Sequence, residues 1–412
     1  MGVQKIVVLR AHEWLAEAAA TGNFAVAAQQ LEVYKLERAQ FEPKAPVRMP
    51  GEDTFMLDAV ASDELTDDDV EDVFNEAFGD DVVGVFSNPQ IQPVAVVNPS
   101  QHVGDHTDVE SALNLTSLKN AGDEGRGVKI AIVDSGVDGT QVSVVGGWSN
   151  KPGVAPGQGA PGSHGTMCAL DALIAAPQAQ IHDYPLLQSV GGHWVAFLSD
   201  AIRFFSEIMI QQLQLPGPMV VNNSWALFDR SSDAPHGHQQ NYWGNPSHPF
   251  NTITSAVVAA GADVLFAAGN CGSPGPDSRC GARDVGGGQS IHGANSHPDV
   301  ISVAAVTIND DRLAYSSQGP GSLTHDKPDL AAFSHFRYTN KNPDLHTGTS
   351  AASPVAAGVV AALRSKSSAR NIPPADIKQA LLDNARDVGN TNGWGPDYGC
   401  GVIDASAAWA AV

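Results

Sequence analysis

The sequence predicts a large α/β domain, with three layers around a mainly parallel sheet, preceded by a small α+β domain. The length of 412 residues leaves room for a large domain of about 300 residues and a smaller one. Residues 1–100 contain 18 acidic and 6 basic residues, and this asymmetry indicates a separate N-terminal unit. Beyond residue 108, four apolar runs alternate with helical stretches, as strands buried on both faces of a parallel sheet require.

The N-terminal unit is expected to alternate strands and helices. Apolar runs predict strands at 5–9 and 55–60, and helical spacing predicts a helix within 12–31. Thr66 and the three aspartates after it predict the start of a second helix. Residues 81–97 then predict a final pair of strands interrupted by Ser-Asn-Pro.

A polar segment rich in turn residues follows and predicts the domain boundary. We therefore assign a first domain to 1–98, a linker to 99–108 and a second domain to 109–412. The apolar runs of the second domain predict buried strands at 128–134, 218–224, 262–269 and 299–306.

The formal charge of −22 argues against nucleic acid or an anionic membrane as a partner, since both would repel the chain. No run approaches the 18 apolar residues of a membrane span, and residues 1–24 lack the pattern of a signal peptide. We therefore expect a chain without a membrane partner that is cytoplasmic or exported by a non-classical route.

Three residues are candidates for nucleophilic catalysis. Asp134 ends a buried strand, where open α/β sheets place their sites. His164 lies where a glycine-rich segment passes into a helix, and Ser350 lies at the entry of a helix rich in Ala, Gly and Val. Each residue taken alone is better explained as a turn aspartate, a structural histidine or a capping serine. Asp, His and Ser in this chain order match one known arrangement of a catalytic triad.

The segments AIVDSGVD, SHGTMCA and GTSAASPVAAG carry these three residues, and the chain resembles the subtilisin-like (S8) serine peptidases through them. The resemblance implies a subtilisin-like fold and peptide-bond hydrolysis through an acyl-enzyme on Ser350, without a required cofactor. It also implies an oxyanion donor, which FAAGN supplies as Asn270, with the Ser350 backbone N–H as its partner. A catalytically silent binding module is the alternative. An esterase is disfavoured because the serine is not in a G-x-S-x-G turn.

The same resemblance assigns the segments that hold a peptide or protein substrate. Ser224, Trp225 and Ala226 match the edge onto which the substrate strand adds, and the opposite pocket wall is implied for three residues, Ala267, Ala268 and Gly269. Ala226 replaces the usual glycine, and its methyl group is expected either to narrow the pocket or to shift the bound peptide.

Cysteines and metal ligands give weaker signals. Cys271 and Cys280 enclose a Pro/Gly loop short enough for a disulfide beside Asn270. Cys168 is explained best as a small buried residue. Structural calcium stays open as an alternative but is not supported by the usual ligands, because Ser143 replaces the aspartate of many family members and the usual loop after the histidine is missing.

Residues 227–250 form an enlarged segment beside the expected cleft. A lid, a specificity loop, a dimer contact and a solvated surface insertion all remain open for it. It contains His236, His238 and His248, whose spacing does not match a closed zinc site.

The N-terminal unit resembles the propeptide-inhibitor domain of the same family in size and element order. The resemblance implies a ferredoxin-like fold that assists folding and inhibits the enzyme, with its last residues in the substrate cleft. We expect autocleavage within 97–108, and a retained regulatory domain is the alternative.

Overall fold

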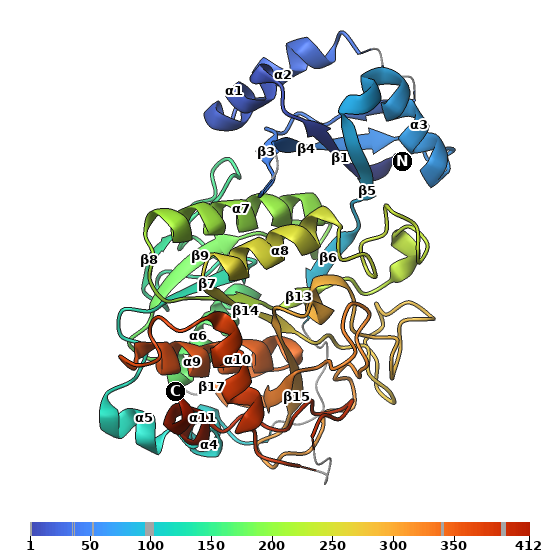
Figure 1. Cartoon of the computed structure of the whole chain (residues 1–412). Helices are drawn as coiled ribbons and strands as arrows, with labels where there is room; N and C mark the ends of the chain where they lie inside the picture. The colour runs from blue at the N-terminus through green and yellow to red at the C-terminus, as the bar shows by residue number, and fades with distance from the viewer. Residues whose placement is uncertain are drawn as a thin grey trace.

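The computed structural model describes residues 2–34, 36, 38–51, 53–94, 103–338, 342–388 and 393–412. A small N-terminal unit lies on one side of a larger domain, as the blue and the teal-to-red parts of Figure 1 show. Among the described residues, no helix combines the length and the apolar character that crossing a bilayer requires.

An antiparallel sheet forms the centre of the N-terminal unit. Its strand order is β2-β4-β1-β5, with β3 also paired to β4, and the connectivity is that of a ferredoxin-like unit. The expected helix over 12–31 is two helices, because Gly22 adopts a φ of +64° and Asn23 caps the second. Thr66 caps the predicted acidic helix through a capping box with Asp69. The elements are β1 (Val3–Arg10), α1 (Glu13–Thr21), α2 (Phe24–Leu31), β2 (Ala39–Phe41), β3 (Val47–Arg48), β4 (Thr54–Ala61), α3 (Asp67–Phe78) and β5 (Val82–Ser87).

The two faces of β1 bury different surfaces. Val7 and Leu9 pack against the helices of their own unit. Ile6 and Val8 point to the opposite face and share a core with the larger domain. The alternation of side chains along the strand therefore joins the two domains through an apolar interface.

The larger domain is built on a seven-stranded sheet in the order β16-β15-β14-β12-β7-β9-β8. Every neighbouring pair in this sheet is parallel, which confirms the predicted α/β class. The four predicted apolar runs correspond to β7, β12, β14 and β15. The strands are β7 (Lys129–Asp134), β8 (Val144–Gly147), β9 (Gln180–Pro185), β12 (Met219–Asn223), β14 (Ala262–Ala267), β15 (Ile301–Val306) and β16 (Leu330–Phe333).

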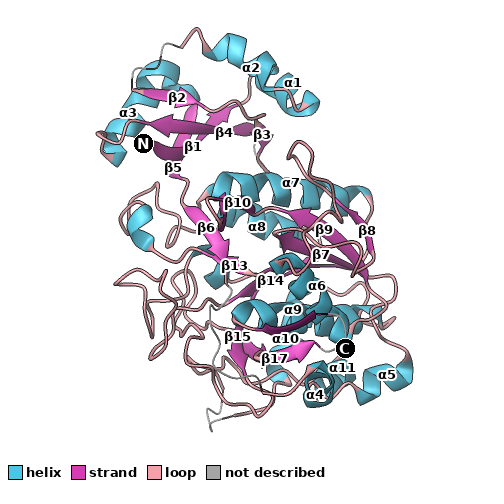
Figure 2. Cartoon of the chain, turned by 180° about the vertical axis from the view of Figure 1, so that it is seen from behind, coloured by secondary structure: helices cyan, strands magenta, loops and turns pink. Residues whose placement is uncertain are grey.

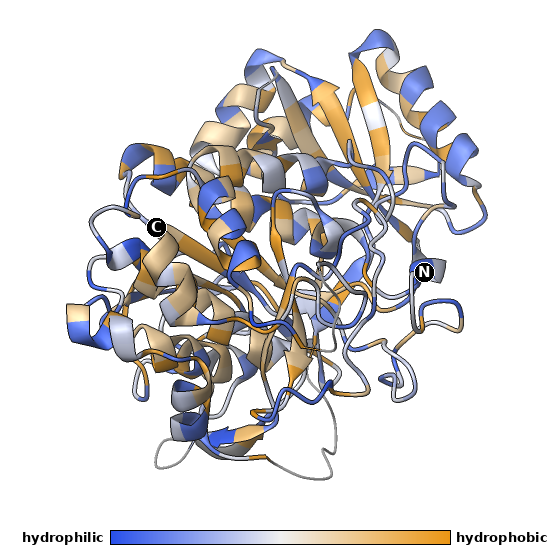
Figure 3. Ribbon diagram, turned by 60° about the horizontal axis from the view of Figure 1, so that its bottom comes forward, coloured by the Kyte–Doolittle hydropathy of each residue, from blue (hydrophilic) through white to orange (hydrophobic). Residues whose placement is uncertain are grey.

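Helices cover both faces of the sheet and complete the three layers. Ile130 and Ile132 of β7 belong to the core formed with α6 (His164–Ala175) and α9 (Thr349–Ser365), whereas Ala131 and Val133 belong to the core formed with α7 (Leu198–Gln214) and α8 (Pro249–Ala259). Figure 3 shows the corresponding apolar colouring of the central strands. The smaller elements are α4 (His106–Ala112), α5 (Thr116–Ala121), β17 (Phe336–Tyr338), β18 (Asn342–His346), α10 (Pro374–Asp383) and α11 (Ala405–Ala411).

The end of the N-terminal unit enters the larger domain. The sequence predicts a strand pair within 81–97, but β6 (Gln90–Pro93) leaves β5 and pairs instead with β13 (Trp225–Ala226) and β11 (His193–Phe197). Strand β10 (Gln188–Val190) extends this second sheet, of which β6, β10 and β13 are labelled in Figure 2. The expected linker 99–108 lies partly outside the described residues, and its last residues form the start of α4, because Asp105 caps that helix with Asp108.

Candidate active site

Asp134 and His164 come together at the carboxyl end of β7. Asp134 ends the strand, and His164 is the first residue of α6, whose preceding residue Ser163 caps the helix. The Asp134 Oδ1 atom lies 2.8 Å from His164 Nδ1, and Asp134 is fully buried. His164 Nε2 has no hydrogen-bond partner within the described part of the chain. The imidazole is therefore held on one side and has a nitrogen available on the other.

Ser350 and Asn270 meet at the main-chain carbonyl of Val94. Ser350 is the second residue of α9, and its Oγ donates to the Val94 oxygen at 2.8 Å. Asn270 follows β14, and its Nδ2 donates to the same oxygen at 2.7 Å. The Ser350 backbone N–H, which the sequence leads us to expect in this role, is not among the described donors to that oxygen. The main-chain carbonyl of Val94 therefore lies between the side chains of Ser350 and Asn270 and accepts a hydrogen bond from each.

Gly348 allows this close approach. It lies immediately before α9 with a φ of +79°, a conformation that favours glycine. A Cβ atom at this position would overlap the Val94 oxygen and crowd Asn270 Nδ2 and Ser350 Oγ.

Strand β6 and the following residue Val94 lie along the cleft as an added strand. Pro93 and Gln92 pair antiparallel with Trp225 and Ala226, and the Val94 N–H donates to Ser224 O at 2.9 Å. On the other side, β6 pairs with β11 through Ile91 and Gln90. The segment thus pairs with a strand on each side, as a peptide does when it binds by β-strand addition.

A family model described as the subtilase family matches residues 125–401, which include Asp134, His164, Asn270 and Ser350. The chain belongs to the subtilase family. This is a family of serine-type endopeptidases, and the match confirms the resemblance seen in the sequence.

Two curated relatives and one solved structure are similar to this subtilase. Subtilisin E of Bacillus subtilis is 26% identical over 309 residues, covering 72% of this chain and 70% of the relative. M-protease of Shouchella clausii is 27% identical over 311 residues, covering 72% and 68%. The crystal structure of fervidolysin from Fervidobacterium pennivorans, a keratinolytic enzyme related to subtilisin, matches with a TM-score of 0.66 and 18% identity. The match covers 100% of this chain and 61% of the fervidolysin chain, and it supports the subtilisin-like fold.

The side chain of Val94 lies in a small apolar pocket of this subtilase. The pocket is formed with Ala226, Phe228, Ala267 and Cys271, and Cys280 packs at its edge. Cys271 and Cys280 form a disulfide, so the bridge is part of the pocket wall. These contacts leave Val94 fully buried. The walls therefore enclose a side chain of the size of valine.

The other two residues implied for the pocket wall have different neighbours. The Ala268 N–H donates to Val303 O on the adjacent strand. The Gly269 N–H donates to Thr349 Oγ1 at 3.1 Å, which ties the end of β14 to the start of α9. Of the predicted stretch Ala267–Gly269, only Ala267 belongs to the Val94 cluster.

Cys168 lies beneath the Asp134–His164 pair. Its Sγ is 4.0 Å from both Asp134 Oδ2 and His164 Nδ1. Burial, and next the charge of Asp134, raise the pKa of the Cys168 thiol well above its ordinary value. The thiol is therefore neutral and packs as a small apolar group. Within the described residues, these three side chains are also the one group close enough to share a metal ion.

The residues at the positions of the family's usual calcium ligands do not fit a calcium ion. Ser143 is exposed and has no carboxylate, and α6 passes through a short turn into β9 without a ligand loop. Three hydrogen bonds from Thr140 and Gln141 already occupy the carboxylate of Asp138 in the same region. We derive no step through calcium.

The enlarged segment 227–250 contacts the N-terminal unit. The buried Lys5 Nζ lies 2.6 Å from both Gln240 Oε1 and Asp67 Oδ1. His248 Nε2 lies 2.9 Å from Ser87 O, and burial lowers the pKa of His248 to about 4. The histidines of the segment have separate partners, since His238 contacts Asp68 and His236 stacks on Trp243.

Sequence reasoning missed β11, Phe228 and Arg279. The Gly191-Gly192 pair between two short runs is a hairpin signal that identifies β11. Phe228 and Arg279 carry no comparable local signal, because their positions at the cleft depend on the fold.

Proposed function

We propose that this subtilase is a serine endopeptidase, made as a zymogen that cuts its own Val94–Ala95 bond. The observation that carries the proposal is the Val94 carbonyl oxygen, which accepts hydrogen bonds from Ser350 Oγ at 2.8 Å and Asn270 Nδ2 at 2.7 Å. The contact supports cleavage at this bond rather than within 97–108, the interval that the sequence favours.

In the proposed reaction, Ser350 Oγ attacks the carbonyl carbon of the scissile bond while His164 Nε2 takes the hydroxyl proton. Asp134 orients the imidazole through Nδ1 and stabilises its positive charge. Asn270 donates to the developing oxyanion. The proton then passes from His164 to the leaving amine as the C–N bond breaks, and water hydrolyses the ester on Ser350 with the same histidine as the base.

The N-terminal unit acts in this proposal as the inhibitor. Strand β6 fills the position of a substrate between β11 and β13, and β1 buries Ile6 and Val8 against the larger domain. The segment 227–250 supports this role, because it holds Ser87 through Gln240 and His248 shortly before β6 begins.

Intact mass and N-terminal sequencing test the proposal on the wild-type chain, Ser350→Ala and the control Ser365→Ala at the far end of α9. We expect wild type and Ser365→Ala to gain an N-terminus at Ala95 and to react with a fluorophosphonate. Ser350→Ala is expected to stay whole and unlabelled. An unlabelled wild type would contradict the peptidase, and a labelled but whole wild type would favour a retained regulatory domain.

A further inference from the structure

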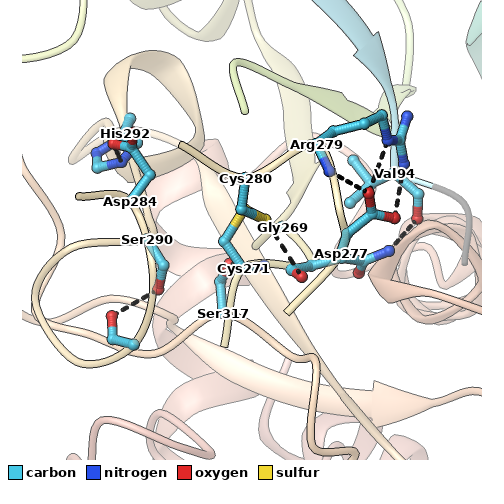
Figure 4. Close-up of a disulfide and its surroundings, with 12 residues drawn as sticks. Val94, Gly269, Cys271, Asp277, Arg279, Cys280, Asp284, Ser290, His292 and Ser317 are labelled. Atoms are coloured by element: carbon cyan, nitrogen blue, oxygen red, sulfur yellow. Dashed lines mark hydrogen bonds and ion pairs between the residues drawn. A yellow bond between two sulfur atoms is a disulfide. The ribbon is translucent and has the colours of Figure 1, made fainter. Parts of the chain in front are cut away.

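Arg279 reaches the segment in the cleft from the disulfide loop. Its Nη1 donates to the main-chain oxygen of Pro93 at 2.8 Å. The same nitrogen lies 3.4 Å from Gln92 Oε1. Figure 4 shows the guanidinium close to Val94 and joined by hydrogen bonds to the carboxylate of Asp277.

Among the described residues, Asp277 and Phe228 hold the guanidinium in place. Asp277 accepts from Nε at 2.9 Å and from Nη2 at 3.0 Å, a two-point contact that fixes the plane of the group. The Arg279 guanidinium carbon lies 4.0 Å from the centre of the Phe228 ring. With these two contacts made through Nε, Nη2 and the face of the group, Nη1 is directed at the Pro93 carbonyl.

The loop itself is anchored to the oxyanion residue and the pocket. The disulfide Cys271–Cys280 closes it, and the Asp277 N–H donates to Asn270 O at 2.9 Å. The Gly281 N–H donates to Phe228 O at 3.0 Å on the other side. The position of Arg279 is therefore coupled to that of Asn270 and of the pocket wall.

The contact suits the group that it meets. Proline has no N–H, so the carbonyl is the one main-chain hydrogen-bonding group that Pro93 offers. The pairing with β11 reaches only Ile91 and Gln90. Along the segment, Gln90 and Ile91 pair with β11, and the Val94 N–H donates to Ser224 O. Arg279 adds a charged donor at Pro93, which lies between them.

We propose that Arg279 is a substrate-binding residue, which holds the main-chain carbonyl of the residue before the scissile one. The inference rests on the proposed function and extends it to extended peptide substrates. Proline is accepted directly before the scissile residue, since no N–H is needed there. A residue with a side-chain oxygen, such as glutamine, is favoured one position earlier.

The test compares two peptides on the processed enzyme. One is Ile-Gln-Pro-Val p-nitroanilide, and the other replaces the proline carbonyl oxygen with sulfur, a weaker acceptor. The enzymes are wild type, Arg279→Ala and the control Arg283→Ala, whose exposed side chain lies in the same region. Each kcat/KM is expressed per site labelled by a fluorophosphonate.

Loss of a charged hydrogen bond predicts that Arg279→Ala cleaves the oxygen peptide about 10- to 100-fold more slowly than wild type. The sulfur peptide is expected to slow wild type and Arg283→Ala, but not to slow Arg279→Ala further. Equal sulfur effects in wild type and Arg279→Ala, or equal rates of these two enzymes on the oxygen peptide, would overturn the inference.

Two further results keep the interpretations separate. A wild type that is not labelled by the fluorophosphonate defeats the proposed function itself. If Arg279→Ala does not fold, Arg279→Lys repeats the comparison, because it keeps the charge but loses the planar contact with Asp277.

Discussion

The side-chain oxygen of Asn270 accepts hydrogen bonds from both the backbone N–H of Thr349, at 3.0 Å, and its Oγ1, at 3.1 Å. The two bonds fix the orientation of the amide, so that its Nδ2 faces the Val94 carbonyl. Thr349→Val keeps the shape of the residue and removes the hydroxyl. We expect kcat on peptide anilides to fall about five- to tenfold, because the Asn270 amide loses one neutral hydrogen bond and the Gly269 N–H loses its acceptor.

Asn270→Ala removes the donor itself and is expected to lower kcat about 10²- to 10³-fold. Thr252→Val, on the exposed side of α8, is the control for the threonine change. A Thr349→Val enzyme with the wild-type kcat would show that the hydroxyl does not orient the amide.

The pocket around Val94 predicts a preference for a small branched residue at the scissile position. We expect the kcat/KM of wild type for valine peptides to be at least about tenfold higher than for phenylalanine peptides. One extra methylene group in a hydrophobic pocket already changes the ratio of two kcat/KM values by about 10- to 200-fold. Ala226→Gly removes a wall methyl and should raise kcat/KM for phenylalanine relative to valine. Matched p-nitroanilides measure both ratios, and a wild type that prefers phenylalanine would contradict the pocket assignment.

Removing the disulfide is expected to destabilise the fold. The two cysteines are nine positions apart. Closing a loop of that length lowers the entropy of the unfolded chain, and this raises the free energy of unfolding by about 2–3 kcal/mol. Denaturant unfolding of the Cys271→Ser/Cys280→Ser variant, in a Ser350→Ala background that prevents self-digestion, measures the loss. Cys400→Ser is the control, because Cys400 is a free cysteine. Equal losses in the two variants would contradict a stabilising bridge.

His248 predicts a loss of stability in acid. Burial lowers its pKa from 6.5 to about 4, so the neutral form favours the folded state. Between pH 6.5 and about 4 the unfolded chain binds a proton on His248 and the folded chain does not. The free energy of unfolding is therefore highest above pH 6.5 and decreases by up to about 3 kcal/mol as the pH falls towards 4. Unfolding of the Ser350→Ala chain between pH 7 and 4, compared with the same chain carrying His248→Asn, isolates this contribution. Parallel pH profiles for the two proteins would exclude His248 as its source.

Much of the fold follows from local sequence. The runs at 128–134 and 262–269 are apolar because both faces of the sheet are covered, and they form strands as predicted. The break of the first helix at Gly22 is also a local effect, although the alanine-rich spacing across it predicts one helix.

Contacts between segments that are far apart in the chain could not be predicted from the sequence. Strand β6 contains two glutamines and a proline, and its partners β11 and β13 lie about a hundred residues or more further along the chain. Arg279 is a single basic residue in a Pro/Gly loop, and its contact with Pro93 exists because the loop and the N-terminal segment meet at the cleft. The motifs around Asp134, His164 and Ser350 predicted the chemistry, and the meeting of distant segments determines what the site holds.

Only Asn88 and Pro89 separate β5, in the sheet of the N-terminal unit, from β6 in the cleft. In the proposed zymogen, this short tether gives the segment at Ser350 a high effective concentration while the chain is whole, and that concentration does not depend on dilution. Cutting the bond after Val94 turns the same contact into an association between two molecules. Self-cutting by one chain would therefore proceed at the same rate at any protein concentration, whereas escape of the cut inhibitor would become more complete as the protein is diluted.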